Sequence, residues 1–182
     1  MSGAPFLLAP LDSAAHDRSA FDSAAPALNR YLCEQATQDM RRRVAACFVA
    51  LARGPEQPVA AIAAIAGYYT FAAASVLLAD LPASVRRQLP RYPTVPAVRM
   101  GRLAVDQRFQ GQGLGAALLA DALERAARAE IAAYALVVDA KDAAAAAFYR
   151  HHGFIALPDA ALTLFLPLSS AAPLQRSPQH PV

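Results

Sequence analysis

The arrangement of apolar and polar residues predicts an antiparallel hairpin in the first half of the chain. Apolar runs at 44–52 and 59–72 have the length of strands, and the turn-forming segment R-G-P-E-Q-P separates them. Near the N-terminus, the stretch P-F-L-L-A-P-L predicts an edge strand. Between the edge strand and the hairpin, residues 21–43 predict a helix with Ser23 as its N-cap and Pro26 in its first turn.

Beyond the hairpin the pattern alternates between helix and strand. The helix at 113–129 places the charged residues Asp121 and Glu124 on one face and Leu119 and Leu123 on the opposite face, as expected for a helix lying on a sheet. Antiparallel strands followed by a β-α-β unit predict an α/β domain with a mixed sheet. The expected elements are one or two helices at 75–89, a strand at 97–105, a helix at 113–129, a strand at 135–138, a helix at 141–152 capped by Gly153, and strands at 154–158 and 162–168.

Length and composition restrict the class of protein. The 182 residues suit one domain, which we place at 1–168, and the tail at 169–182 is rich in Pro, Ser and Gln and is expected to be disordered. No run of eighteen apolar residues predicts a membrane span, and the N-terminus lacks the basic region of a signal peptide. We therefore expect a cytoplasmic protein without a membrane partner.

Cysteines and histidines give no sign of a metal site. Cys33 and Cys47 lack C-x-x-C spacing and are expected to be buried free thiols, and the four histidines form no ligand pattern. The net charge of +3 rests almost entirely on arginine. That charge permits a polyanionic partner without requiring one.

The most informative motif is the glycine loop after the strand at 97–105. Residues 111–116, G-Q-G-L-G-A, match the dinucleotide fingerprint G-x-G-x-x-[G/A], and Asp139 ends the next strand, where a ribose-binding acid is expected. Three features argue against a dinucleotide fold. D-Q-R-F-Q separates the strand from the first glycine, too little chain follows the motif, and an antiparallel hairpin precedes it.

The same residues also fit a phosphate cradle with the spacing Q-x-x-G-x-G, formed by Gln110, Gly113 and Gly115. Glycines let backbone N–H groups approach phosphate oxygens, and the following helix adds its free N-terminal donors. Such a cradle binds a pyrophosphate whichever cofactor carries it. A glycine turn that binds no ligand is the third alternative, and the absence of G-K-[ST] excludes a Walker loop.

At this point the sequence resembles the GNAT superfamily of N-acetyltransferases, whose motif [QR]-x-x-G-x-[GA] follows a strand. The resemblance covers most of the chain. F-D-S-A-A-P-A-L-N-R-Y-L-C-E-Q-A-T-Q-D, A-G-Y-Y-T, R-L-A-V-D-Q-R-F-Q-G-Q-G-L-G and A-F-Y-R-H-H-G-F together look like the TacT-type toxins of bacterial toxin–antitoxin pairs, which acetylate aminoacyl-tRNA. The resemblance implies a GNAT fold, that is, a mixed, mostly antiparallel central sheet flanked by helices and splayed between its two central strands.

The resemblance also implies how acetyl-CoA is held. The strand Leu103-Ala104-Val105 would splay from the strand at 135–138, and its exposed backbone groups would hold the pantetheine arm and the acetyl carbonyl. The loop would bind the pyrophosphate, with Arg108 as a candidate partner for the adenosine phosphate. The implied loop residues are Gln110, Gly111, Gln112, Gly113, Leu114 and Gly115.

Tyr149 in A-F-Y-R is the catalytic residue by resemblance. A phenol with a free pKa of about 10 stays protonated at neutral pH and can protonate the departing CoA thiolate. Phe148 and Tyr149 point about 100° apart on a helix, so we expect Phe148 to pack in the core while Tyr149 faces the cleft. No general base stands out, and an α-amine with a pKa of about 7.7–8.0 has little need of one.

Arginines carry the substrate hypothesis, in which a basic rim contacts tRNA phosphates. By resemblance, the partners are a ribbon-helix-helix antitoxin, operator DNA reached only through that antitoxin, and a second copy of the chain in a homodimer. Two other functions stay open: an acetyltransferase acting on a protein N-terminus or a small amine, and a non-catalytic module that binds a nucleotide. The candidate tRNA contacts are Arg41, Arg42, Arg43, Arg86, Arg87, Arg91, Arg99 and Arg150.

Overall fold

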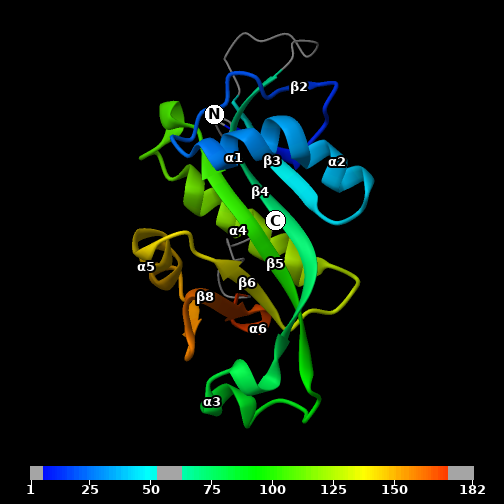
Figure 1. Ribbon diagram of the computed structural model, residues 1–182, viewed down its shortest axis with the longest axis vertical. Helices are drawn as coiled ribbons and strands as arrows, with labels where there is room; N and C mark the ends of the chain where they lie inside the picture. Colours follow the sequence, from blue (N-terminus) through cyan, green and yellow to red (C-terminus); the bar gives the residue numbers. More distant parts are fainter. Residues whose placement is uncertain (1–5, 53–62, 172–182) are drawn as a thin grey trace, which may run out of the picture. The chain divides into compact units, whose positions relative to one another are not determined.

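The computed structural model describes residues 6–52 and 63–171 and divides the chain into two compact units (Figure 1). The first unit comprises Met1–Ala72 and Gly101–Asp121, and the second comprises Ala73–Met100 and Ala122–Val182. Two long strands, β4 (Ala63–Leu77) and β5 (Thr94–Val105), each contribute residues to both units.

In the first unit, hydrogen-bonded strands follow the order β1-β3-β4-β5. β1 and β3 pair antiparallel, as do β3 and β4, which confirms the predicted edge strand and hairpin. The short strand β2 pairs in parallel with the start of β4. The part of the hairpin predicted at 53–62 lies outside the described residues. Besides β4 and β5, the elements of this unit are β1 (Phe6–Pro10), β2 (His16–Asp17), α1 (Pro26–Arg30), η1 (Tyr31–Gln35), α2 (Ala36–Arg41), β3 (Ala46–Ala52), η3 (Gln107–Phe109) and the first half of α4 (Leu114–Arg128).

The predicted helix at 21–43 forms three consecutive helical segments. The helix begins at Pro26 after Ala25, so the prediction that Ser23 is the N-cap is wrong; Ser23 instead donates both its N–H and its hydroxyl to Asn29 Oδ1. The middle segment, η1, is a π-helix. Its wider turn lets the Leu32 carbonyl accept a hydrogen bond from Arg18 at 3.3 Å.

Alternation along β4 assigns its two faces to different helices. Tyr68 packs in a core cluster with Tyr31 and Leu32, which are on η1. The neighbouring Gly67 points the other way, where an added Cβ would lie 2.8 Å from Leu118 on α4. In Figure 1, α1 and α2 accordingly cross one side of β3 and β4, and α4 lies on the other side.

In the second unit, hydrogen-bonded strands follow the order β5-β6-β8-β7. β6 pairs in parallel with β5 and antiparallel with β8, and β7 pairs antiparallel with β8. The β-α-β unit and the mixed, mostly antiparallel sheet are therefore as predicted. Besides parts of β4, β5 and α4, the elements of this unit are η2 (Leu78–Asp80), α3 (Ala83–Arg86), β6 (Ala135–Asp139), α5 (Ala143–His151), β7 (Ile155–Leu157), β8 (Ala160–Pro167) and α6 (Leu168–Ala171).

One stretch has a different secondary structure from the one predicted. Residues 75–77, expected to be helical, continue β4, because burial there alternates and places Val76 in a core cluster with Val95 and Phe165. α6 begins at Leu168, and the end of the domain at 168 stays a prediction. The tail predicted to be disordered lies outside the described residues from 172 onward.

Candidate active site

The glycine loop lies in the first unit, between β5 and α4. Gly111 and Gly113 adopt positive φ values of 74° and 80°, a conformation that L side chains rarely adopt. A Cβ added at either position would meet no atom within 4 Å. The loop therefore needs glycine for its backbone conformation, and the space beside both residues is free for a ligand.

The start of α4 supplies donors beside this space. The N–H groups of Leu114, Gly115 and Ala116 precede the first intrahelical hydrogen bonds and make no hydrogen bond with another described residue. The side chains of Gln110 and Gln112 donate back to the carbonyls of Val105 and Arg108, at 3.0 and 3.3 Å. These two side chains fasten the loop, so its backbone N–H groups stay available to an anion, and the arrangement fits a diphosphate.

A buried carboxylate, Asp106, fixes the segment between β5 and the glycine loop, and it was not identified from the sequence. Asp106 is 1% exposed and accepts four hydrogen bonds: three from Arg108, through its N–H, Nε and Nη2, each at 2.9 Å, and one from the Asp22 N–H at 3.1 Å. Burial raises the pKa of Asp106, but these hydrogen bonds outweigh it and hold the pKa below its ordinary value. Arg108, predicted to contact the adenosine phosphate, is thus placed against Asp106.

The strand before the loop carries the residues expected to hold the pantetheine arm. Pairing between β5 and β6 covers Ala97–Met100, and Leu103, Ala104 and Val105 lie beyond the end of that register. Ala104 is buried, whereas Leu103 and Val105 are half-buried. The Val105 carbonyl accepts the bond from Gln110, which ties the end of the strand to the glycine loop.

Tyr149 lies in the second unit, on α5, a helix that begins at Asp142 as its N-cap and ends before Gly153. The ring is 7% exposed and packs against Phe154 at 5.5 Å between centroids. The Tyr149 hydroxyl makes no hydrogen bond with another described residue, so it is available to a substrate. Phe148, expected to be the packed member of the pair, is the more exposed of the two.

Two influences set the acidity of Tyr149. Burial raises its pKa to about 12, and the negative charge of Asp139 adds to that increase. Asp139 is fixed at the end of β6, where it pairs with Arg99 and accepts a hydrogen bond from the Thr163 hydroxyl at 3.0 Å. Arg99, predicted to contact tRNA, is therefore already paired with a carboxylate.

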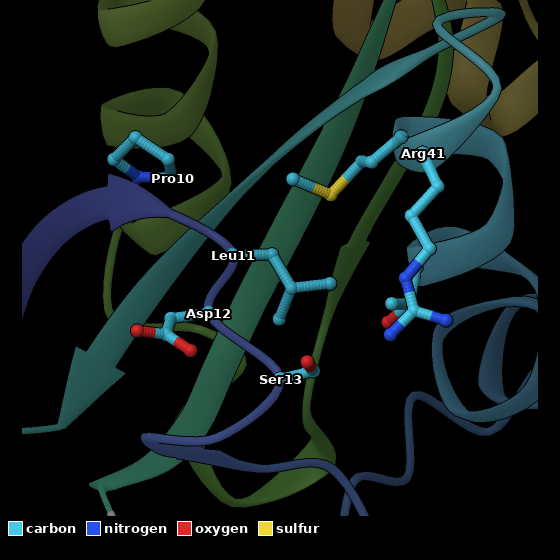
Figure 2. Close-up of a pocket in the computed structure, with 7 residues that line it drawn as sticks. Pro10, Leu11, Asp12, Ser13 and Arg41 are labelled. Carbon is cyan, nitrogen blue, oxygen red and sulfur yellow. The ribbon is translucent and has the colours of Figure 1, made fainter.

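The remaining candidate arginines are exposed and fall into separate groups. Arg41 lines a pocket of about 550 Å³ between the end of β1 and α2; Figure 2 shows Leu11 in the middle of this pocket and Arg41 at its edge. Arg42 and Arg43 follow the end of α2, which closes with Arg43 in the left-handed region at φ 58°. Arg150 donates to the Ala161 carbonyl at 3.4 Å.

Three arginines on the segment between β4 and β5 share one pocket. Arg86, Arg87 and Arg91 line a pocket of about 380 Å³ together with Leu78 and Leu89. None of the described residues that line this pocket is a carboxylate. Residues that are close in sequence thus become a concentrated positive surface.

The described residues contain no group of three metal-ligating side chains, and no helix among them is long and apolar enough to cross a membrane. Both described cysteines are free thiols. Cys47 is buried as predicted, but Cys33 is exposed, so that part of the prediction is wrong. Cys33 lies on the outer side of η1 and donates to the Arg18 carbonyl at 3.2 Å.

Comparison with known proteins identifies this combination of loop, strand and helix. Residues 44–156 match the family model described as the acetyltransferase (GNAT) domain. The chain is 37% identical over 164 residues to a tRNA-acetylating toxin of Mycobacterium tuberculosis (strain ATCC 25618 / H37Rv), covering 89% of this chain and 92% of the relative. A KacT mutant crystal structure superimposes with a TM-score of 0.84 at 27% identity, covering 94% of this chain and 99% of KacT.

Solved relatives include complexes. AtaT complexed with acetyl-methionyl-tRNAfMet has a TM-score of 0.81 at 31% identity, covering 93% of this chain and 98% of AtaT. A structure of AtaTR bound with acetyl-CoA (TM-score 0.77, 30% identity, 93% and 98% covered) and one of the AtaT–AtaR complex bound to DNA (0.69, 27%, 92% and 98%) are also similar. From the matched domain, the relatives and the geometry of the loop, the chain belongs to the GNAT acetyltransferase family, and acetyl-CoA is its acyl donor.

Proposed function

We propose that this acetyltransferase is a toxin that transfers the acetyl group of acetyl-CoA to the α-amine of an aminoacyl-tRNA and so stops translation. One observation carries the proposal: 89% of the chain is similar to a protein named as a tRNA-acetylating toxin. The solved complex of AtaT with acetyl-methionyl-tRNAfMet, at 31% identity, supports the same substrate class.

The first unit binds the acyl donor. The N–H groups at the start of α4 and the loop from Gln110 to Gly115 take the diphosphate, because they offer free donors at the positive end of a 15-residue helix. The backbone of Leu103-Ala104-Val105 takes the pantetheine arm and the acetyl carbonyl. Arg108 contributes through Asp106, which positions the loop, and part of its half-exposed guanidinium is left for the adenosine phosphate.

Tyr149 acts as a proton donor toward the leaving CoA sulfur. The amine nitrogen attacks the thioester carbonyl, the C–S bond breaks, and the sulfur, which keeps the electron pair, takes a proton from the Tyr149 hydroxyl. A pKa of about 12 lies above that of an ordinary thiol, about 8.5, so complete transfer to an isolated thiolate is uphill. Tyr149 therefore acts first as a hydrogen-bond donor to the sulfur as the bond breaks. The proton lost by the acylated nitrogen then restores the phenol through water.

The acceptor needs little help to lose its proton. An α-amine has a pKa of about 7.7–8.0, so a fair fraction is neutral near pH 7, and an amine next to an ester is less basic still. A lysine acceptor, at about 10.4, demands a base that the described site does not offer. This chemistry favours an aminoacyl ester over a protein side chain.

Exposed arginines bind the tRNA. The pocket of Arg86, Arg87 and Arg91 gathers three positive charges, and none of the described residues that line it is a carboxylate. Arg41, Arg42 and Arg43 form a second group at the end of α2. Arg150, like Arg86, also donates to a backbone carbonyl, and Arg99 contributes least because Asp139 neutralises it.

The partners follow from the toxin assignment. We propose a ribbon-helix-helix antitoxin, operator DNA bound only through that antitoxin, a homodimer, and a cytoplasmic location. The AtaT–AtaR complex bound to DNA supports the antitoxin and the operator at 27% identity. The exposed apolar residues Ile155, on the edge strand β7, and Leu162, on the neighbouring strand β8, support a contact between two copies.

Labelled acetyl-CoA tests the substrate class. The protein is incubated with total charged tRNA, deacylated tRNA and total protein in separate reactions, and the acetylated amino acid is released and identified by mass spectrometry. We expect label on charged tRNA alone, and we expect Tyr149→Phe to reduce it at least a hundredfold without changing the melting temperature. Label on protein alone would replace the proposal with N-terminal acetylation.

A further inference from the structure

Arg102, on the strand expected to hold the acyl donor, has no anionic partner among the described residues. It precedes Leu103 on β5 and, by alternation, shares its face with Ala104. Ala104 packs in the core cluster of Tyr31 and Tyr68, so Arg102 points toward the side covered by α1 and η1. The carbon at the centre of its guanidinium lies 3.5 Å from the centroid of the Tyr31 ring.

Tyr31 is a rigid platform for this guanidinium. Its ring is 3% exposed and its hydroxyl donates to Asp39 Oδ2 at 3.0 Å. The ring of Tyr68 lies nearly parallel to it, at 16° and 6.4 Å, and the Tyr68 hydroxyl is itself bonded to the Leu28 carbonyl at 2.8 Å. Since the ring is held at its edge and packed in the core, the guanidinium stacked on it has a fixed plane.

None of the five N–H donors of the stacked Arg102 guanidinium is hydrogen-bonded to a described residue. Two other arginines of the first unit are engaged: Arg108 with Asp106, and Arg18 with the Leu32 carbonyl and the Thr37 hydroxyl. Among the described residues, every buried polar side-chain atom has a hydrogen-bond partner, so the partnerless nitrogens of half-buried Arg102 reach solvent. A fixed fork of donors with an unbalanced charge suits a phosphate, which it binds through two parallel bonds.

The position of Arg102 on β5 indicates which phosphate of the substrate it binds. Strand residues rise about 3.4 Å each, so Arg102 lies within about 10 Å of Val105 along β5. The acceptor amine must reach the thioester held on this segment. The nucleotide esterified to the amino acid is therefore brought close to the same segment. We propose that Arg102 is a specificity-determining residue that binds the phosphodiester of the 3′-terminal nucleotide of aminoacyl-tRNA. This inference rests on the proposed function, since it assumes a tRNA acceptor.

Two acceptors separate this role from a structural one. Charged tRNA carries the nucleotide, whereas an amino acid methyl ester offers the same α-amine on an ester without any phosphate. For Arg102→Met we expect the ratio of kcat/KM on charged tRNA to kcat/KM on the methyl ester to fall at least tenfold, through KM for tRNA. Arg102→Lys keeps the charge but loses the fork, so its ratio falls by less. Arg128→Met removes an exposed arginine paired with Glu124 and serves as the matched control.

The outcomes distinguish this inference from the proposed function. An unchanged ratio for Arg102→Met, measured while the wild type acetylates charged tRNA, overturns the role of Arg102 alone. A wild type that acetylates the methyl ester but never charged tRNA overturns the proposed function and the inference together. KM for acetyl-CoA and the melting temperature are measured on each variant, and a fall of the same size on both acceptors identifies a folding defect and overturns the specificity role.

Discussion

Replacing Asp106 by asparagine tests whether one buried carboxylate holds the glycine loop to the rest of the first unit. Its two oxygens accept four hydrogen bonds, from Arg108 and from the Asp22 N–H. An asparagine of the same shape keeps one acceptor oxygen and turns an NH₂ group toward the remaining donors. Two of the four bonds are therefore lost, and the charge that strengthens the others disappears.

The size of the effect follows from these contacts. A hydrogen bond to a charged group contributes about 1.5–3 kcal/mol, so two lost bonds give an upper limit of about 3–6 kcal/mol. The Arg108 side chain is 53% exposed, and water replaces part of what it loses. We therefore expect Asp106→Asn to lower the free energy of unfolding by about 2–3 kcal/mol at pH 7 and to raise KM for acetyl-CoA.

Urea unfolding at two pH values checks both size and cause. The folded-state pKa of Asp106 is lower than its ordinary value, so its charge stabilises the fold above the unfolded pKa of about 3.9. That stabilisation is lost as pH falls through the folded pKa, and the difference between wild type and variant must shrink on acidification. Asp142→Asn is the control, because asparagine caps a helix as well as aspartate does. A loss below about 0.5 kcal/mol at pH 7, or a difference that persists in acid, would show that the charge of Asp106 does not hold the loop.

Three further predictions concern single positions. Gly67→Ala places a Cβ 2.8 Å from Leu118 Cδ1 and 3.0 Å from the Ala104 carbonyl, so it should cost about 1–3 kcal/mol and lower Tm; an unchanged Tm contradicts the packing of α4 on β4. Gly113→Ala forces an L residue to φ 80° at a cost of about 1–2 kcal/mol, so we expect Tm to fall by a few degrees and KM for acetyl-CoA to rise, although no atom clashes with the added Cβ; an unchanged KM contradicts the role of the loop. Spectrophotometric titration of wild type against Tyr149→Phe should show no ionisation of Tyr149 below about pH 11, because the pKa of Tyr149 is raised to about 12. The stability that the protonated phenol contributes is complete below about pH 10 and is lost as pH rises through about 12. Ionisation near pH 10 would contradict the burial of this hydroxyl.

Sequence patterns correctly predicted the helices, strands and turns whose conformation depends on residues close together in the chain. The glycine loop, α4 and α5 follow from residues within one turn of each other: Gly111 and Gly113 at positive φ, apolar spacing along α4, and Gly153 after α5. Two apolar runs of strand length, separated by a turn-forming segment, likewise sufficed to predict that β3 pairs with β4. Each of these features is set by neighbours along the chain, which a single sequence displays directly.

Contacts between distant residues decided the features that sequence reasoning missed. Asp106 binds the N–H of Asp22, 84 positions earlier, and no local pattern announces such a pair. The π-helical turn of η1 is matched by a side chain from outside the helix, Arg18. The exposure of Phe148 relative to Tyr149 depends on how α5 packs, because both rings satisfy the same helical spacing. Tertiary packing therefore decides between conformations that fit the helical spacing of the sequence equally well.

A crystal structure of the protein with acetyl-CoA tests whether the glycine loop and Tyr149 act on the same donor, because it locates both ends of acetyl-CoA at once. We predict the diphosphate on the N–H groups of Leu114, Gly115 and Ala116, and the sulfur within about 3.5 Å of the Tyr149 hydroxyl. A diphosphate bound away from the start of α4, or a hydroxyl turned away from the sulfur, would contradict it.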